Sequence, residues 1–199
     1  MKNTNITKRP TAEAKTLIAK AVAEARRQNR LPAVLFVCLG NICRSPAAQG
    51  ITEKIAAEQG VAIRCDSAGF YGGHAGDLPD RRMREAAFAR GYRLDHRSRR
   101  IRLSDLDDFD IVIGMDDSNL SDLHRLADTS DRDRKIIRMT DFASAHPAAD
   151  CVPDPYYEGA AGFQLVLNLL EDACGRSPPY DGRPMPASIS SPLRAPFVL

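Results

Sequence analysis

The segment VLFVCLGNICRSPAA, residues 34–48, constrains the fold more than any other part of the chain. Residues 34–37 are all apolar and strand-forming, and they lead directly to Cys38, which is typical of a buried strand. A short loop follows, and then Ser45 and Pro46 provide a good helix N-cap and a good first helical residue. The segment therefore predicts a strand, a tight loop and a helix, with Cys38 at the carboxyl end of the strand.

The alternation of strand and helix patterns continues along the chain. Short apolar runs predict strands near residues 33–38, 62–66, 110–114 and 135–139, and helical patterns lie near residues 46–59, 80–91, 117–127 and 159–174. Such alternation is typical of right-handed crossovers between parallel strands. We therefore expect an α/β fold with a doubly wound parallel sheet, helices on both faces, and a ligand site beyond the carboxyl ends of the strands.

The loop after the first strand combines a nucleophile with groups that bind an anion. Backbone N–H groups of residues 39–44, together with the N-terminus of the next helix, can bind an anion and favour the thiolate form of Cys38. Arg44 adds a planar, permanently charged group suited to a phosphoryl group. The loop thus predicts covalent phosphoryl transfer through cysteine. The alternative is an ordinary strand-turn-helix in which Cys38 is a buried thiol.

Residues 32–174 resemble the low-molecular-weight protein-tyrosine phosphatases, whose loop reads V-C-x-G-N-I-C-R-S-P. Further motifs occur in the family's order: DSAG at 66–69, DHRSR at 95–99, GMDDSNL at 114–120 and DPYY at 154–157. The resemblance implies a four-stranded sheet of the Rossmann-like phosphatase fold. It also implies hydrolysis of phosphotyrosine in a protein substrate through a cysteinyl-phosphate intermediate, without a cofactor.

The resemblance assigns roles to the residues that would carry out the reaction. Cys38 is the expected nucleophile, and Arg44 is expected to hold two phosphoryl oxygens. Asp154, directed by the proline that follows it, is the expected general acid. One or both of Tyr156 and Tyr157 are expected to wall the cleft. The alternative for the last three is an Asp-Pro turn followed by two tyrosines that pack on the last helix.

Other loop residues are expected to bind substrate or to hold the loop in shape. The residues expected to bind substrate are Leu39, Gly40, Asn41, Ile42 and Cys43. The resemblance implies that Asn41 has a strained backbone, held by hydrogen bonds of its side chain to a serine and to His96; Ser45 and Ser67 match the family's serines. Asparagine tolerates such a conformation better than most residues. Ser45 can also donate a hydrogen bond to the Cys38 thiolate.

Cys43 lies close enough in sequence to Cys38 to capture an oxidised nucleophile as a reversible disulfide, although it could also be a small buried residue. The remaining cysteines lack ligand spacing, so no metal site is expected: Cys65, Cys151 and Cys174. Many family members carry a large aromatic residue as a second wall of the cleft, and that position falls near Gly73. Tyr71 is the first candidate to replace it, before Phe70 and His74.

Three other functions are weighed against this interpretation. Arsenate reductases of the same fold need two further cysteines at suitable spacing and lack the Asp-Pro-Tyr loop. Protein-arginine phosphatases that resemble this chain carry threonine at the position of Ile42 and lack the paired tyrosines. A phosphotyrosine-binding module without turnover is the third alternative, and the joint presence of Cys38, Arg44 and Asp154 speaks against it.

The charge distribution divides the chain into three parts. Residues 1–30 form a basic, helix-prone extension with eight Lys or Arg and two Glu, which either packs on the core or extends freely. Residues 31–174 form the expected phosphatase domain, with seventeen Lys or Arg against twenty-three Asp or Glu. Residues 175–199 contain six prolines and read as a disordered tail. An acidic core does not favour a nucleic-acid partner.

The sequence also bears on the protein's compartment. No apolar run approaches eighteen residues, so no transmembrane segment is expected, and the first thirty residues lack a hydrophobic signal core. Five cysteines do not suggest a disulfide framework, and a nucleophilic thiol favours a reducing compartment. We therefore expect a cytoplasmic enzyme, and the sequence does not indicate its oligomeric state.

Overall fold

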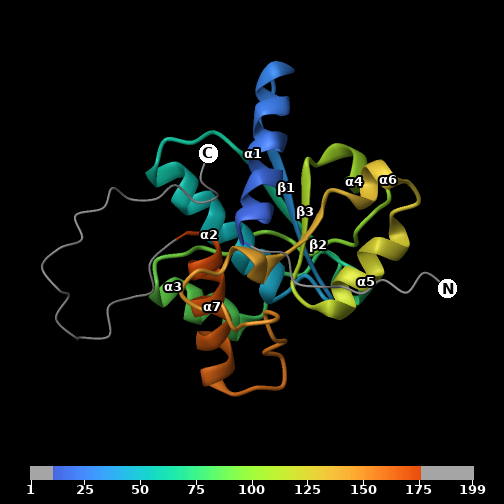
Figure 1. The fold of residues 1–199 in the computed structure, drawn as a ribbon. Helices are drawn as coiled ribbons and strands as arrows, with labels where there is room; N and C mark the ends of the chain where they lie inside the picture. Colours follow the sequence, from blue (N-terminus) through green and yellow to red (C-terminus); the bar gives the residue numbers. More distant parts are fainter. Residues whose placement is uncertain (1–10, 176–199) are drawn as a thin grey trace, which may run out of the picture.

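The computed structural model describes residues 11–175 (Figure 1). Its centre is a four-stranded parallel sheet in the order β2-β1-β3-β4. The strands are β1 (Ala33–Cys38), β2 (Arg64–Gly69), β3 (Ile111–Gly114) and β4 (Ile136–Arg138). The predicted α/β fold with a doubly wound parallel sheet is confirmed. Residues 1–10 of the basic extension and residues 176–199 of the expected disordered tail lie outside the described residues.

Helices cover both faces of this sheet. The longer helices are α1 (Thr11–Arg27), α2 (Arg44–Glu58), α3 (Arg81–Ala89), α5 (Asp117–Leu126) and α7 (Ala160–Ala173). The shorter elements are α4 (Asp105–Asp108), α6 (Ser130–Asp133) and the 3₁₀ turns η1 (Gly72–His74) and η2 (Met139–Phe142). Figure 1 shows α1, α2, α3 and α7 on one side of the sheet and α4, α5 and α6 on the other.

The alternation of side chains along β1 produces two apolar layers. Val34, Phe36 and Cys38 point to the larger cluster, which α1, α2, α3 and α7 complete. Leu35 and Val37 point to the smaller cluster, which includes residues of α4 and α5. Because both faces are covered, β1 is buried along its whole length and holds Cys38 at a fixed position at the carboxyl edge of the sheet.

Two sequence expectations need correction at the local level. The second strand begins and ends later than the predicted 62–66, because its pairing with β1 continues until Gly69 lies opposite Cys38. Ser45 is not the N-cap of α2. The helix begins at Arg44, and its cap residue Cys43 makes no side-chain capping bond. The hydroxyl of Ser45 instead points into the loop, where it bonds Cys38 and Asn41.

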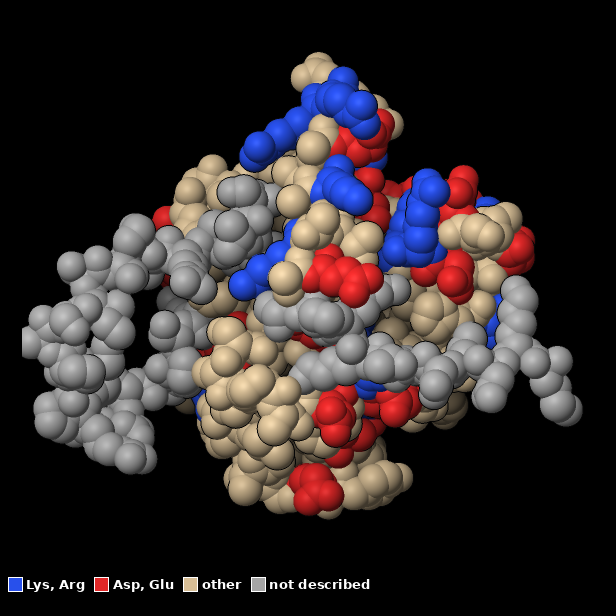
Figure 2. All heavy atoms as spheres, viewed as in Figure 1, with Lys and Arg blue, Asp and Glu red and all other residues tan. Residues whose placement is uncertain are grey.

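The N-terminal helix α1 packs on the core. Its buried residues recur at helical spacing and form one face: Ala14, Ile18, Val22 and Ala25. Arg30, just after the helix, donates two hydrogen bonds of 2.7 and 2.6 Å to the carboxylate of Asp110, next to β3. The outer face mixes Lys20, Arg26 and Arg27 with Glu13 and Glu24, and Figure 2 shows both signs of charge over α1. Within residues 11–175, no helix combines the length and apolar character that crossing a membrane requires.

Candidate active site

The loop between β1 and α2 rests directly on the end of β2. The amide of Tyr71 donates to Leu39 O at 2.8 Å, and the amide of Phe70 donates to Cys38 O at 3.3 Å. Gly69 lies opposite Cys38, and a Cβ added there would stand 2.6 Å from Leu39 O. Only glycine allows the loop to approach the strand this closely.

Cys38 is buried, and polar groups of the loop surround its sulfur. The Ser45 Oγ lies 3.0 Å from Cys38 Sγ, and the Asn41 backbone N–H donates to the same sulfur at 3.3 Å. Each of these groups can donate a hydrogen bond to the sulfur.

Asn41 holds the loop in its bent shape. Its φ of +54° lies in the left-handed region, where asparagine is one of the few side chains found routinely. Its Nδ2 donates to the Oγ atoms of Ser45 and Ser67, each at 2.9 Å, and its Oδ1 accepts from the Arg99 amide at 2.9 Å. Ser67 Oγ in turn donates to Gln49 Oε1 at 2.8 Å. Both ends of the Asn41 amide are therefore bonded.

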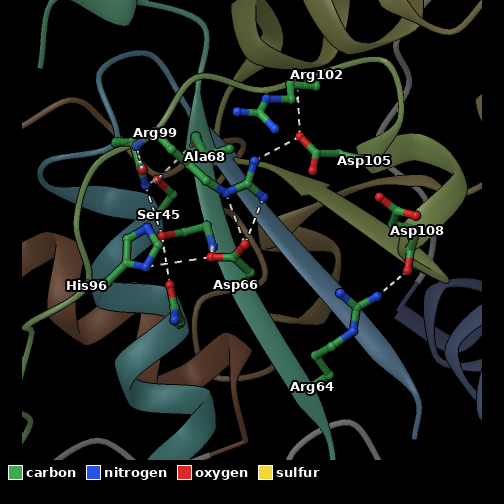
Figure 3. A network of polar contacts seen from close by, with 12 residues as sticks. Ser45, Arg64, Asp66, Ala68, His96, Arg99, Arg102, Asp105 and Asp108 are labelled. Carbon is green, nitrogen blue, oxygen red and sulfur yellow. Dashed lines mark hydrogen bonds and ion pairs between the residues drawn. The ribbon is translucent and has the colours of Figure 1, made fainter. Parts of the chain in front are cut away.

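The expectation that His96 bonds Asn41 is wrong. His96 Nδ1 faces Asp66 Oδ1 at 3.6 Å, and its buried Nε2 has no hydrogen-bond partner among the described residues. Burial lowers the pKa of His96, although the nearby Asp66 charge opposes the shift. The backbone N–H of Arg99 occupies the position that the histidine was expected to take. Figure 3 shows the His96 ring facing Asp66 instead.

Arg44 lies between the loop and two carboxylates. Its side chain is only 2% exposed; Nη1 donates to Asp116 Oδ2 at 2.5 Å and to Val152 O at 3.3 Å, and Nη2 donates to Asp154 Oδ2 at 2.6 Å. Burial alone would lower the pKa of Arg44, but the charges of Cys38, Asp154 and Asp116 outweigh it and raise that pKa. The sequence predicted the approach of Arg44 to the site but not its partner Asp116, although Asp116 lies in the GMDDSNL motif just after a predicted strand.

Asp154 and the two tyrosines lie on the loop before α7. Asp154 is 44% exposed, and its Oδ1 accepts the Tyr156 amide at 3.1 Å. The ring of Tyr156 meets that of Tyr157 edge to face at 5.0 Å, and the Arg82 guanidinium lies 5.3 Å from the centre of the Tyr156 ring. Tyr157 is 94% exposed. The structure thus brings Asp154 to Arg44 and leaves both tyrosine rings with solvent-facing surface.

On the other side of the loop, Tyr71 and His74 stand near the expected second wall. The Tyr71 ring lies so close over Gly73 that a Cβ there would meet it at 2.3 Å, and Tyr71 packs edge to face on His74 at 5.4 Å. The His74 ring also lies 3.4 Å from where a Cβ of Gly40 would be. Phe70, in contrast, packs against the smaller apolar cluster on the opposite face of the sheet.

The remaining loop residues differ in exposure. Leu39 is 52% exposed at the loop tip, whereas Ile42 is partly buried against the larger apolar cluster. Cys43 is buried, and burial, reinforced by the charges of Asp80 and Cys38, strongly raises its pKa. All the cysteines are free thiols, and the residues from 11 to 175 include no group of three or more side chains placed to hold a metal ion.

Comparison with known proteins identifies the family. The family model described as low molecular weight phosphotyrosine protein phosphatase matches residues 33–177. A low molecular weight protein-tyrosine-phosphatase of Bacillus subtilis is 41% identical over 144 residues, which cover 71% of this chain and 90% of the relative.

Two solved structures extend the comparison. A protein tyrosine phosphatase from Entamoeba histolytica has a TM-score of 0.69 and 41% identity, covering 72% of this chain and 92% of its own. A Drosophila arginine phosphatase has a TM-score of 0.67 and 30% identity, and the match covers 71% of this chain and 92% of the Drosophila chain. With a family model matched across most of its length, this chain belongs to the low molecular weight phosphotyrosine protein phosphatase family.

Proposed function

We propose that this protein hydrolyses phosphotyrosine in protein substrates, with Cys38 as the nucleophile, Arg44 as the phosphoryl-binding residue and Asp154 as the general acid. The observation that carries the proposal is the buried guanidinium of Arg44, which bonds Asp154 at 2.6 Å and whose pKa the charge of Cys38 helps to raise. A nucleophile, a phosphate-binding cation and a proton donor on separate elements are the groups that this reaction needs.

In the first half-reaction, the Cys38 thiolate attacks phosphorus. The S–P bond forms while the bond between phosphorus and the tyrosine oxygen breaks, and Asp154 in its protonated form gives its proton to the departing oxygen. The loop amides and Arg44 bind the phosphoryl oxygens as charge develops on them. No metal ion enters this scheme.

In the second half-reaction, water attacks the cysteinyl phosphate. Asp154, now ionised, accepts a proton from the water, the S–P bond breaks, and Cys38 leaves as a thiolate. The Ser45 hydroxyl, 3.0 Å from Cys38 Sγ, and the Asn41 N–H stabilise the departing thiolate by hydrogen bonding.

The rings around the loop support an aryl phosphate as the substrate. Tyr156 and Tyr157 lie on the side of the general acid, and Tyr71 and His74 lie on the side of Gly40. Aromatic rings make favourable stacked or edge-to-face contacts with another planar ring. The similarity to an arginine phosphatase makes phosphoarginine the competing substrate to test. We also propose the cytoplasm as the site of action, because a nucleophilic thiol favours a reducing compartment.

The experiment compares the full-length protein with Cys38→Ser and the control Cys65→Ser on four substrates: p-nitrophenyl phosphate, a phosphotyrosine peptide, phosphoarginine and arsenate with thioredoxin. We expect turnover of the first two by the wild type and the control. We expect Cys38→Ser to keep its fold, measured by circular dichroism, and to lose turnover. Preferred hydrolysis of phosphoarginine, reduction of arsenate, or peptide binding without turnover would each replace the proposal with the corresponding alternative.

A further inference from the structure

Arg99 contacts the catalytic loop through its backbone. Its N–H donates to Asn41 Oδ1 at 2.9 Å, and its carbonyl accepts the Gly69 amide at 2.9 Å. The amide of Ile101 donates back to Gly69 O at 2.9 Å. The segment from Arg99 to Ile101 therefore lies along the end of β2, and one of its amides sets the position of the Asn41 side chain.

The Arg99 side chain is held by carboxylates from two different elements. Its Nε and Nη2 donate to Asp66 Oδ2 at 3.0 and 2.8 Å, and its Nη1 donates to Asp105 Oδ2 at 2.9 Å. Asp66 belongs to β2 and Asp105 belongs to α4. The Asp105 carboxylate also accepts a hydrogen bond from the Arg102 amide at 2.8 Å. Figure 3 shows the guanidinium between the two carboxylates, and we call these three side chains the Arg99 clamp.

The clamp also reaches the other end of the Asn41 amide. Asp66 Oδ1 accepts the Ser67 amide at 2.7 Å, and Ser67 Oγ accepts a hydrogen bond from Asn41 Nδ2 at 2.9 Å. Two residues outside the loop therefore hold the Asn41 side chain, Arg99 and Ser67. Arg99 is a member of the ion pair with Asp66, and Ser67 is the residue that follows Asp66.

The bonds of Asn41 lead from the clamp to the sulfur. A left-handed backbone at a residue other than glycine persists only where its surroundings hold it. In this conformation the Asn41 N–H points at Cys38 Sγ, and its Nδ2 donates to Ser45 Oγ, which lies 3.0 Å from the same sulfur. A shift of Arg99 would move Asn41 and with it two of the contacts on Cys38.

We infer that Arg99 is a positioning residue for the catalytic loop: clamped by Asp66 and Asp105, it holds Asn41 in the left-handed conformation that aims two hydrogen bonds at Cys38. The inference rests on the proposed function of Cys38 as the nucleophile. It predicts that loss of the guanidinium changes the reactivity of a sulfur that Arg99 does not touch.

The chain provides a matched control in Arg132. This arginine, in α6, is also held by two carboxylates, Asp107 and Asp128, and its side chain is exposed to a similar degree, 20% against 28% for Arg99. The experiment measures the rate at which iodoacetamide alkylates Cys38 across the pH range in wild type, Arg99→Gln, Arg99→Lys and Arg132→Gln, with the modified cysteine identified by mass spectrometry. Thermal unfolding of each variant is recorded in parallel.

We expect Arg99→Gln to move the alkylation profile of Cys38 upward by about one pH unit, which is roughly a tenfold slower reaction on the acidic side. Arg99→Lys should lie between it and wild type, since lysine keeps the charge but cannot engage both carboxylates equally. Arg132→Gln should leave the alkylation profile of Cys38 unchanged, even if its melting temperature falls by as much as that of Arg99→Gln. An unchanged profile in Arg99→Gln, or an equal shift in Arg132→Gln, would overturn the inference.

A second pair of variants keeps the inference testable if Arg99→Gln does not fold. Asp105→Asn weakens one half of the clamp, and Asp107→Asn makes the same change at Arg132. A shifted Cys38 profile in the first variant alone supports the inference, and no shift in either refutes it. Alkylation of a different cysteine in the wild type would contradict the proposed function itself.

Discussion

Replacing Gly69 by alanine should slow catalysis strongly and still leave the protein folded. The added Cβ would stand 2.6 Å from Leu39 O, 2.8 Å from Asn41 N and 3.0 Å from Gly40 C, and all three are backbone atoms that cannot rotate away. To regain the 3.4 Å of an ordinary contact, the Leu39 carbonyl would have to retreat by about 0.8 Å. A displacement on the order of 1 Å at a catalytic group can cost about a hundredfold in rate. We therefore expect kcat/KM to fall by roughly 30- to 100-fold.

The free energy of unfolding should fall by only about 1–3 kcal/mol, the usual cost of an extra methyl group in a packed site. Gly72→Ala is the control, because its Cβ would meet nothing closer than Arg100 Cδ at 3.6 Å. The assay is hydrolysis of p-nitrophenyl phosphate, with urea unfolding measured on the same samples. If Gly69→Ala retains a wild-type kcat/KM, or if both variants lose the same activity, the close approach of strand and loop does not set the catalytic geometry.

Three further predictions concern other parts of the molecule. Asp154→Ala should slow the hydrolysis of phenyl phosphate by about 10²–10³-fold and that of p-nitrophenyl phosphate much less, because only the more basic phenolate leaving group needs a proton from Asp154. Equal losses for the two substrates would place the general acid elsewhere. Peroxide should inactivate the enzyme reversibly through a Cys38–Cys43 disulfide, found by peptide mapping. Because burial raises the pKa of Cys43 far above neutrality, closure should accelerate about tenfold per pH unit, and a pH-independent rate would exclude Cys43 as the attacking thiolate. Burial alone would raise the pKa of Asp172, but hydrogen bonds from residues 144–146 lower it overall, so its stabilising effect is present above the usual aspartate pKa and is lost as pH falls through the folded value. Asp172→Asn should therefore cost roughly 1.5–3 kcal/mol at pH 7 and flatten the loss of unfolding free energy below about pH 4; a variant as acid-sensitive as wild type would contradict this.

Sequence patterns predicted the elements whose formation depends mainly on neighbouring residues in the chain. The strand that ends at Cys38 follows from its apolar character and was found where the sequence placed it. The helix after it follows from helix-forming residues, but it begins at Arg44, two residues earlier than predicted. The end of β2 did not follow, because the residues that lead to Gly69 are polar and become a strand only through pairing with β1. Serine is a common N-cap residue, but the hydroxyl of Ser45 bonds the Cys38 sulfur and the Asn41 side chain and does not cap the helix.

The contacts between distant segments were the hardest to predict. The resemblance implied His96 as a partner for Asn41, because a sequence motif records side chains. The backbone N–H that takes its place belongs to almost every residue, so no motif marks it. The same limit applies to Arg44, whose partner Asp116 is one of many aspartates until the sheet brings the ends of β1 and β3 together. Spatial neighbours of this kind follow from topology, which the motif alone does not contain.

The two carboxylates on Arg44 are not equivalent, and the difference bears on the order of events in catalysis. Asp116 is 23% exposed and also accepts the Asn119 amide at 2.7 Å as the cap of α5, so it is fixed from two sides. Asp154 is 44% exposed and lies on a loop, and its second contact, from the Tyr156 amide, is longer at 3.1 Å. An arriving phosphoryl group competes for the same guanidinium, and it should displace the carboxylate that is held less firmly. We therefore expect substrate binding to free Asp154 from Arg44 at the moment it is needed as an acid, while Asp116 keeps the guanidinium oriented.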